Sequence, residues 1–220
     1  MSQVDVIAID GPVASGKGSV SSGVAKVLGF HVLDSGALYR LTALACMNQG
    51  MDLGDAAAAE KVARLLKPLF KDGKIYLEGK DVTDAIRTEE VGLNASKIAA
   101  YPGVRKALFE LQRRSAVEPG LVADGRDMGS VVFPEARLKI FLTASAESRA
   151  KRRYNQLKEK GISSNIDDLV SDLKDRDRRD MERSVAPLKP AEGARILDSS
   201  GLTLQETIDL VLAWYRESKA

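Results

Sequence analysis

Residues 11–19 read GPVASGKGS, and this glycine-rich stretch stands between a continuous apolar run and an amphipathic segment. The run before it, at residues 6–9, is typical of a strand that is buried on both faces of a parallel sheet. After it, apolar residues recur at helical spacing and stop at Gly29, which predicts a helix with a glycine end: Val20, Val24, Val27 and Leu28. The sequence therefore predicts that residues 11–19 form the turn between a strand and a helix.

Within that turn, the spacing Gly11-x-x-x-x-Gly16-Lys17 is typical of a phosphate-binding loop. Glycines let successive backbone N–H groups converge on an anion, and the helix N-terminus adds its positive dipole end. We expect Lys17 to lie over the phosphates with an exposed side chain. The usual pattern places Ser or Thr directly after the lysine, whereas here Gly18 comes before Ser19.

The charges of the chain nearly balance, since 33 basic and 31 acidic residues give a net charge of +2. A dedicated nucleic-acid binder would show a basic excess, so we expect no nucleic-acid partner. The single cysteine, Cys46, cannot form an intrachain disulfide and is predicted to be a small buried residue. The only histidine, His31, has no second histidine with which to share a metal, so we assign it a structural role.

The N-terminal residues lead directly into the first predicted strand, without the basic and apolar regions of a signal peptide. No stretch of the sequence approaches the ~20 consecutive apolar residues of a membrane-spanning helix. Together with the lone cysteine, these features predict a cytoplasmic protein with no membrane partner.

Short apolar runs alternate with helical patterns along most of the chain. The segments "FHVLDSG", "GLVADGRD", "LKIFLTA" and "ARILDSS" are predicted strands bounded by turn residues. The last helical pattern opens with a capping box at Thr203 and Glu206, and it carries one apolar stripe: Ile208, Val211, Leu212 and Tyr215. This alternation predicts a parallel sheet with helices on both faces.

Residues 66–87 break the alternation. Turn signals at Asp72-Gly73 and Gly79-Lys80 separate short strand-like pieces, which is typical of antiparallel hairpins. Such hairpins cannot join the parallel sheet in sequence order. We therefore expect a small inserted domain here.

Two polar motifs stand at the C-terminal ends of predicted strands, where open α/β sheets bind their ligands. In "LDSGALYR", Ser35 and Gly36 are predicted to cap the next helix, and Arg40 lies one turn further along. In "LVADGRDMG", Asp124 is the candidate for orienting Mg²⁺, in many such sites through water. Both residues also have a structural interpretation, Arg40 as a surface arginine and Asp124 as a turn aspartate.

The C-terminal third supplies arginines at helical spacing. Arg149 and Arg153 are four residues apart, and a second set is predicted to share one helix face: Arg176, Arg179, Asp180 and Arg183. Guanidinium groups suit phosphates that are spread over a donor and an acceptor. A structural helix held by ion pairs would use the same residues.

Several motifs together resemble the cytidylate kinases of bacterial type, within the nucleoside monophosphate kinases. They are the Gly-Lys-Gly-Ser form of the loop, "LDSGALYR", "NASKIAAYPGVR", "ADGRDMGSVVFP" and "DRDRRDMERSVAPL", and they run nearly from end to end. Local departures fall beside the matched positions, at Val13, Ala14, Gly103 and Arg178.

The resemblance implies an α/β fold, a P-loop kinase core with a five-stranded parallel sheet flanked by helices. It also implies a small inserted antiparallel β/helical domain that binds the monophosphate, and a helical lid. The expected boundaries are a core of residues 1–36, 116–148 and 184–220, a monophosphate-binding region with hairpins at 37–115, and a lid with the arginine helix at 149–183.

The resemblance also implies a role for each matched residue. ATP would be bound by Gly11, Pro12, Val13, Ala14, Ser15, Gly16, Lys17, Gly18, Ser19, Arg149 and Arg153. Cytosine would be read by Ser35, Ser96, Arg105 and Asp127, the monophosphate by Arg40 and Arg126, and the sugar by Arg176 and Asp180, with Arg183 on a phosphate. The residues expected to act in catalysis are Lys17, Asp124, Arg126, Arg176 and Arg183, and Mg²⁺ would be held by Ser19 and Asp124.

The implied reaction moves the γ-phosphoryl group of ATP to CMP or dCMP, on a monomeric enzyme with Mg²⁺ as its cofactor. Two alternatives stay open at this point. One is a kinase of another small acceptor, such as uridylate or a metabolite alcohol. The other is a nucleotide-dependent switch, although the sequence has no Asn-Lys-x-Asp motif and its arginine sets imply a second anionic substrate.

Overall fold

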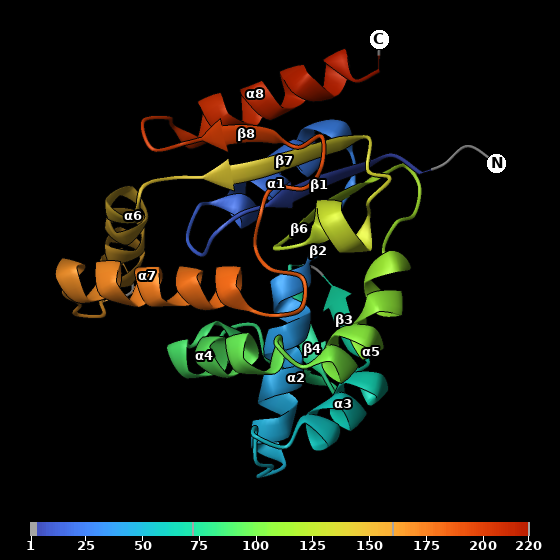
Figure 1. Cartoon of the computed structure of the whole chain (residues 1–220), viewed down its shortest axis with the longest axis vertical. Helices are drawn as coiled ribbons and strands as arrows, with labels where there is room; N and C mark the ends of the chain where they lie inside the picture. The colour runs from blue at the N-terminus through green and yellow to red at the C-terminus, as the bar shows by residue number, and fades with distance from the viewer. Residues whose placement is uncertain (1–3, 72, 160, 220) are drawn as a thin grey trace. The chain divides into compact units, whose positions relative to one another are not determined.

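A computed structural model describes residues 4–71, 73–159 and 161–219, and the chain divides into two compact units (Figure 1). The first unit joins the residues up to Leu33 with those from Ser115 onward. The second unit spans Asp34–Arg114.

The first unit is built on a five-stranded sheet with β1 (Val6–Asp10) at its centre. Both neighbours of β1, namely β6 (Leu121–Gly125) and β7 (Leu138–Thr143), pair with it in parallel. The outer strands are β2 (His31–Asp34) beside β6, and β8 (Arg195–Asp198), which runs parallel to β7. Every residue of β1 and β6 is buried, as the continuous apolar runs predicted.

One face of this sheet is covered by α1 (Lys17–Leu28) and α8 (Leu204–Glu217), which lies along β8 in Figure 1. The apolar stripe predicted for the last helix is buried here, and the predicted capping box is present at the start of α8. Gly29 ends α1 in the left-handed conformation at φ 70°, as predicted. These elements share one apolar core with Ile7 and Ile9 of β1.

The opposite face of the sheet carries η2 (Met128–Val132), a short π-helical turn. Since successive residues of a strand point to opposite faces, Asp10 faces η2 while Ile9 faces α1. The two carboxylate oxygens of Asp10 accept hydrogen bonds from the backbone N–H groups of Met128 and Gly129, each at 2.8 Å. Asp10 thus fastens η2 to the end of the central strand.

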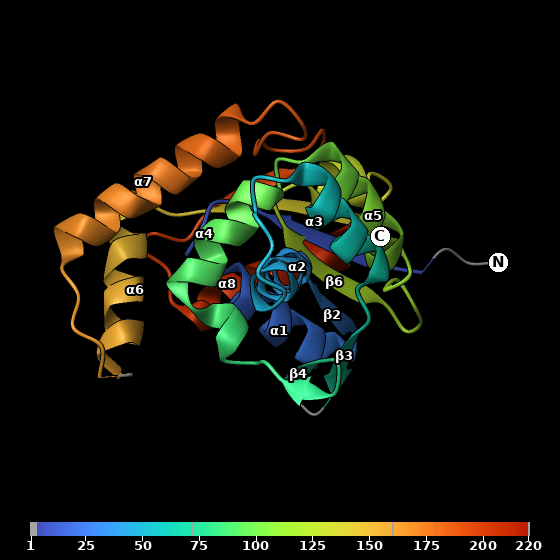
Figure 2. The same cartoon turned by 90° about the horizontal axis from the view of Figure 1, so that it is seen from below.

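Two further helices of this unit, α6 (Ala146–Glu159) and α7 (Ile166–Glu182), pack against each other (Figure 2). The prediction that Arg183 shares a helix face with Arg176 is wrong, because α7 ends at Glu182. Arg183 has an extended backbone (φ −60°, ψ 138°) and its Nε donates to the carbonyl of Ala186 at 2.6 Å.

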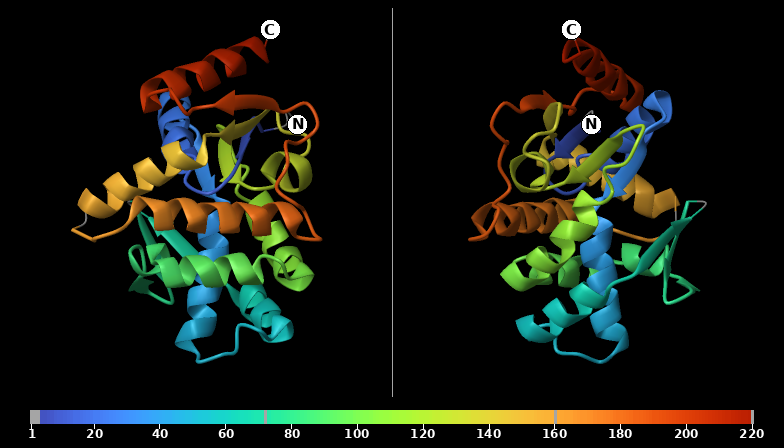
Figure 3. Two further views of the ribbon diagram at one scale, coloured as in Figure 1. Left: turned by 60° about the vertical axis from the view of Figure 1, so that its left-hand side comes forward. Right: turned by 90° about the vertical axis from the view of Figure 1, so that its right-hand side faces the viewer.

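The second unit contains four helices among its described residues: α2 (Ser35–Asn48), α3 (Ala56–Leu65), α4 (Glu89–Ile98) and α5 (Pro102–Arg113). The predicted hairpins form an antiparallel sheet of β3 (Pro68–Lys71), β4 (Lys74–Leu77) and β5 (Lys80–Asp81), followed by the 3-10 turn η1 (Ala85–Arg87) (Figure 3). Asp72 of the expected Asp72-Gly73 turn lies outside the described residues.

The cap of α2 differs from the prediction. Asp34, rather than Ser35 and Gly36, is the N-cap residue, because its carboxylate accepts from the N–H of Ala37 at 3.0 Å. Cys46 in the same helix is a free, buried thiol, as predicted.

The predicted fold class is confirmed by the five-stranded sheet, its flanking helices and the small antiparallel sheet. The chain divides after Leu33 and after Arg114, and the finer core and lid boundaries stay predictions. In the described parts of the chain, no helix is both long and apolar enough to span a membrane.

A substitution at Gly11 tests how closely the loop backbone approaches the sheet. It has φ 155°, and a Cβ atom at this position would overlap the carbonyl oxygen of Leu142 in β7. We expect Gly11→Ala to lower the free energy of unfolding by at least about 3 kcal/mol, because backbone strain and overpacking add. Gly29→Ala is the matched control: its φ is 70° but nothing lies within 4 Å, so it costs only about 1–2 kcal/mol. Equal losses in urea unfolding would contradict the close approach.

Candidate active site

The loop at residues 11–19 has the backbone of an anion-binding turn. Its residues include three with positive φ: Gly11 at 155°, Ala14 at 58° and Gly16 at 92°. Gly16 is the N-cap of α1, so the loop delivers its N–H groups to the start of that helix. For the non-glycine Ala14, a left-handed backbone costs energy, and such strain is concentrated at functional turns.

Three carbonyl groups of the loop each accept a hydrogen bond from a basic side chain. Lys17 Nζ donates to Pro12 at 2.8 Å, and Arg149 Nη1 donates to Val13 at 3.0 Å. Arg152 Nη1 donates to Ser15, also at 3.0 Å. These oxygens are thereby held by the protein. Arg152 was not among the predicted site residues.

Lys17 is 6% exposed, so the expectation of an exposed lysine is wrong. Burial, followed by the charge of Arg126, lowers the pKa of Lys17 to about 7, although the carboxylates of Asp124, Asp10 and Asp180 oppose the shift. The sequence could not show this pKa shift, because Arg126, Asp124 and Asp180 come from distant segments of the chain.

Asp124 lies beside the first turn of α1. It pairs in register with Ile9, so it faces the side of the sheet that α1 covers, and it is 7% exposed. A Cβ atom built at Gly18 would lie 3.6 Å from Asp124 Oδ2, which places the carboxylate next to the glycine that departs from the usual loop pattern.

The donor set near α1 fits Mg²⁺. This ion is usually held by one or two protein oxygens together with water and substrate phosphates. Asp124 supplies a buried carboxylate and Ser19 an exposed hydroxyl in the first turn of α1. Among the described residues, no group of three or more His, Cys, Asp or Glu side chains could hold a metal ion by itself.

Arg126 and Asp180 form an ion pair, with 2.7 Å between Arg126 Nε and Asp180 Oδ2. Burial alone would lower the pKa of Arg126, but the charge of Asp180 and the hydrogen bond to it raise the pKa overall. The guanidinium therefore stays charged. The structure thus pairs Arg126, which is predicted to bind the monophosphate, with Asp180 of α7, which is predicted to bind the sugar.

Arg149 is 5% exposed and is held on several sides. Its Nη2 pairs with Asp177 Oδ2 at 2.6 Å, and its Nε donates to the carbonyl of Ala144 at 3.0 Å. Asp177 was missed by the sequence analysis, in which it was one of many acidic residues of a mixed charged helix. Arg153 lies half-buried on α6, and Arg176 lies half-buried on α7.

Three of the four predicted site residues of the second unit donate hydrogen bonds to backbone or side-chain oxygens. Ser35 Oγ donates to Gln112 Oε1 at 2.9 Å, and Arg40 Nη1 donates to the carbonyl of Ile86 at 2.7 Å. Arg105 Nη1 reaches the carbonyl of Ala99 at 3.5 Å, and Ser96 is half-buried on α4. Gln112, which the sequence analysis did not single out, fixes the hydroxyl of Ser35.

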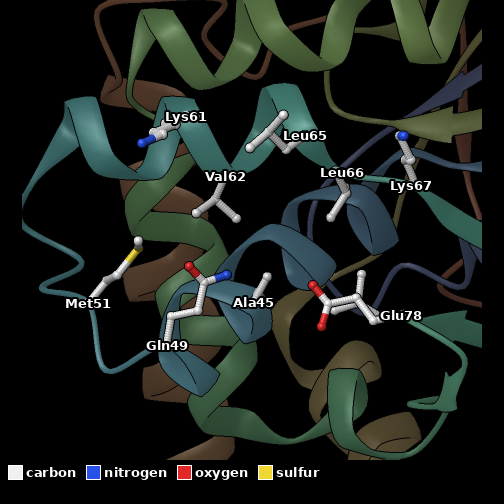
Figure 4. A pocket seen from close by; sticks show the side chains of 10 residues that line it. Ala45, Gln49, Met51, Lys61, Val62, Leu65, Leu66, Lys67 and Glu78 are labelled. Carbon is white, nitrogen blue, oxygen red and sulfur yellow. The ribbon is translucent and has the colours of Figure 1, made fainter.

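A cavity of about 480 Å³ lies in the second unit, between α2, α3 and β4 (Figure 4). Apolar side chains such as Val62 and Leu66 line it together with Lys61, Lys67 and Glu78. None of the predicted site residues, all of which lie in described parts of the chain, is among those that line this cavity. It is therefore not part of the predicted site.

Comparison with known protein families gives one match that spans nearly the whole chain. The family model described as "Cytidylate kinase" matches residues 7–217.

Several curated relatives cover almost all of the chain. A protein named cytidylate kinase from Bordetella bronchiseptica is 59% identical over 211 residues, covering 96% of this chain and 95% of the relative. The cytidylate kinase of Cupriavidus necator is 55% identical, covering 98% of this chain and 97% of the relative. An uncharacterized protein of known structure from Eubacterium ventriosum shares the fold, with a TM-score of 0.53 at 13% identity and coverage of 96% and 98%.

The low pKa of Lys17 leads to a measurable proton uptake. At pH 8 the lysine is mostly neutral, since its pKa is about 7, whereas a bound triphosphate favours the charged form. Calorimetric binding of a magnesium nucleoside triphosphate at pH 8, whose phosphates are already ionised, should take up close to one proton. The binding heat should then differ between HEPES and Tris. Lys17→Arg, which stays charged throughout, should bind with little dependence on the buffer. A buffer-independent heat for the unmodified protein would contradict this assignment.

Proposed function

Because this chain belongs to the cytidylate kinase family, we propose that it transfers the γ-phosphoryl group of ATP to CMP or dCMP. The products are ADP and CDP or dCDP. The observation that carries the proposal is the 59% identity to a named cytidylate kinase over 96% of this chain. The strand, loop and helix around Lys17 support it, because an arrangement of this kind suits the binding of a polyphosphate.

In the proposed reaction, an oxygen of the CMP phosphate attacks the γ-phosphorus of ATP. A new P–O bond forms there while the bond to the β-phosphate oxygen breaks, and ADP leaves with that electron pair. The acceptor oxygen is already ionised near neutral pH, so no strong general base is needed. Catalysis then depends on positioning the two substrates and stabilising their charge.

Lys17 and the loop amides hold the phosphates of ATP in this proposal. The contacts of Lys17 support it, because Nζ already lies within the loop, 2.8 Å from the carbonyl of Pro12. Binding of the triphosphate brings negative charge to a lysine that burial has made easier to deprotonate, and so restores its charged form. Arg149 and Arg153 of α6 complete the proposed ATP contacts.

Three arginines are proposed to stabilise the charge of the transferred group: Arg126, Arg176 and Arg183. The ion pair between Arg126 and Asp180 supports the first of these roles, since it orients a guanidinium that stays charged. Asp180 and Arg176 of α7 are proposed to contact the sugar hydroxyls of CMP as well.

Mg²⁺ is proposed to act with ATP, held through Ser19 and Asp124. When bound, the ion neutralises charge on the phosphate oxygens of the donor. Asp124 is suited to this role because its carboxylate is buried beside the first turn of α1, next to Gly18.

Cytosine is proposed to be read by Ser35, Ser96, Arg105 and Asp127. Arg40 and Arg126 are each proposed to bind the monophosphate. Cytosine presents an N4 amino donor where uracil presents an O4 acceptor, so a carboxylate favours cytosine and repels uracil. Asp127 is 3% exposed, and a buried carboxylate discriminates more strongly than one in water. A monomeric state and a cytoplasmic location stay predictions from the sequence.

A panel of acceptors tests the proposed function. We expect ADP release from ATP with CMP and dCMP, and much slower release with UMP or a small alcohol. Faster turnover of UMP would favour the uridylate alternative. Binding of ATP without turnover of any acceptor would favour a nucleotide-dependent switch.

Asp127→Asn tests the reading of the base. The amide can turn its NH₂ group toward O4 of uracil and so remove the repulsion at nearly constant shape. We expect kcat/KM for CMP to fall and the ratio of CMP to UMP to narrow by at least about tenfold, or ~1.4 kcal/mol. Asp209→Asn, an exposed residue of α8, is the matched control and should leave the ratio unchanged. Equal weakening of both substrates by Asp127→Asn would assign Asp127 to positioning Arg126 instead.

A further inference from the structure

Arg152 of α6 joins the phosphate loop to the end of β8. Its Nη1 donates to the Ser15 carbonyl at 3.0 Å and to Ser199 Oγ at 3.2 Å, while Nη2 donates to the Ser199 carbonyl at 2.5 Å. The same Nη1 lies 3.7 Å from the position that a Cβ of Gly16 would take. One guanidinium therefore covers the peptide unit between Ser15 and Gly16.

That peptide unit decides what the loop presents to an anion. In a planar trans peptide the carbonyl oxygen and the following N–H point in opposite directions. When Arg152 holds the Ser15 oxygen, the N–H of Gly16 must point away from Arg152. If this peptide were reversed, the Ser15 oxygen would take the direction that the Gly16 N–H now has, and it would repel a phosphate on that side. Gly16, at φ 92°, has the conformational freedom for such a reversal.

Ser199, the other residue that Arg152 contacts, is firmly fixed to the sheet. Ser199 is 2% exposed, and both its N–H, at 2.9 Å, and its Oγ, at 3.1 Å, donate to the carbonyl of Thr143 in the neighbouring strand β7. The guanidinium thus connects the loop to the sheet. Its rigid planar shape serves acceptors on two segments at once, which a lysine ammonium on a flexible stem does less well.

We infer that Arg152 is a positioning residue of the donor site, which holds the Ser15–Gly16 peptide in the orientation that receives the phosphates of ATP. This inference rests on the proposed function. In this inference, Arg152 acts on ATP only through the loop backbone. Lys17, by contrast, lies within the loop itself.

Two substitutions of Arg152 test the inference, and a substitution of the neighbouring Lys151 serves as their control. Arg152→Met keeps the stem and removes the donors, whereas Arg152→Lys restores one cationic donor. Lys151→Met is the matched control, because Lys151 is the exposed adjacent residue of α6 and loses the same charge. We expect Arg152→Met to weaken ATP binding at least about tenfold, or ~1.4 kcal/mol. CMP binding and the melting temperature should match those of Lys151→Met, and Arg152→Lys should recover only part of the ATP affinity.

Amide hydrogen exchange supplies the second measurement. We expect faster exchange in peptides that cover residues 11–19 of Arg152→Met, with no change in peptides from β6 and β7. If Arg152→Met does not fold, Arg152→Lys takes its place, with the same pattern expected at smaller size.

Three results would overturn the inference. ATP affinity equal to that of Lys151→Met would show that the bridge does not matter to the donor site. A joint loss of ATP affinity, CMP affinity and melting temperature would show a general structural role. Weaker ATP binding with unchanged loop exchange would make Arg152 a direct ATP ligand. By contrast, an unmodified protein that neither binds ATP nor phosphorylates CMP would disprove the proposed function itself.

Discussion

The hydrogen bonds from Met128 and Gly129 to the Asp10 carboxylate join the glycine-rich loop to the segment that carries Arg126. Asp10 ends the central strand and directly precedes the loop, while η2 directly follows the segment with Arg126. Burial raises the pKa of Asp10 to about 6, although the two backbone hydrogen bonds oppose the shift. At neutral pH the carboxylate is therefore ionised and accepts both bonds. The loop proposed to bind the donor and the segment proposed to bind the acceptor are both joined to this carboxylate.

Side chains of both charges gather near that carboxylate. Lys17 and Arg126 lie among the carboxylates of Asp10, Asp124 and Asp180, and each cation feels several of them. Such a cluster limits the net charge that the protein buries in the absence of substrate. It also holds the Lys17 and Arg126 side chains in place, so that little reorganisation is needed if the proposed substrates bind there.

Most of the fold could be predicted from the sequence, because its helices, strands and turns depend on patterns among residues that are near one another in the chain. Apolar runs gave the strands, turn residues gave the hairpins, and the spacing of glycines and Lys17 gave the loop. Features that depend on distant segments could not be predicted. The pKa of Lys17 depends on its burial and on the charges of Arg126, Asp124 and Asp180, which lie far along the chain. The helix containing Arg176 ends one residue before Arg183. Arg152 carries no signal at all, since its partners are two carbonyl groups and a hydroxyl.

The contacts that hold the loop also determine which of its positions can vary. The arginines of α6 bind the carbonyl oxygens of Val13 and Ser15, and every residue type carries such an oxygen. A substitution at Val13 therefore leaves the acceptor in place, whereas the loss of Arg149 or Arg152 removes a donor that nothing in the loop can replace. Mutational tolerance should be broad at Val13 and narrow in the helix whose arginines hold the loop backbone. Gly11, Gly16 and Lys17 stay constrained within the loop itself. A scan of substitutions would then find part of the functional constraint more than a hundred residues away from the motif that reveals the site.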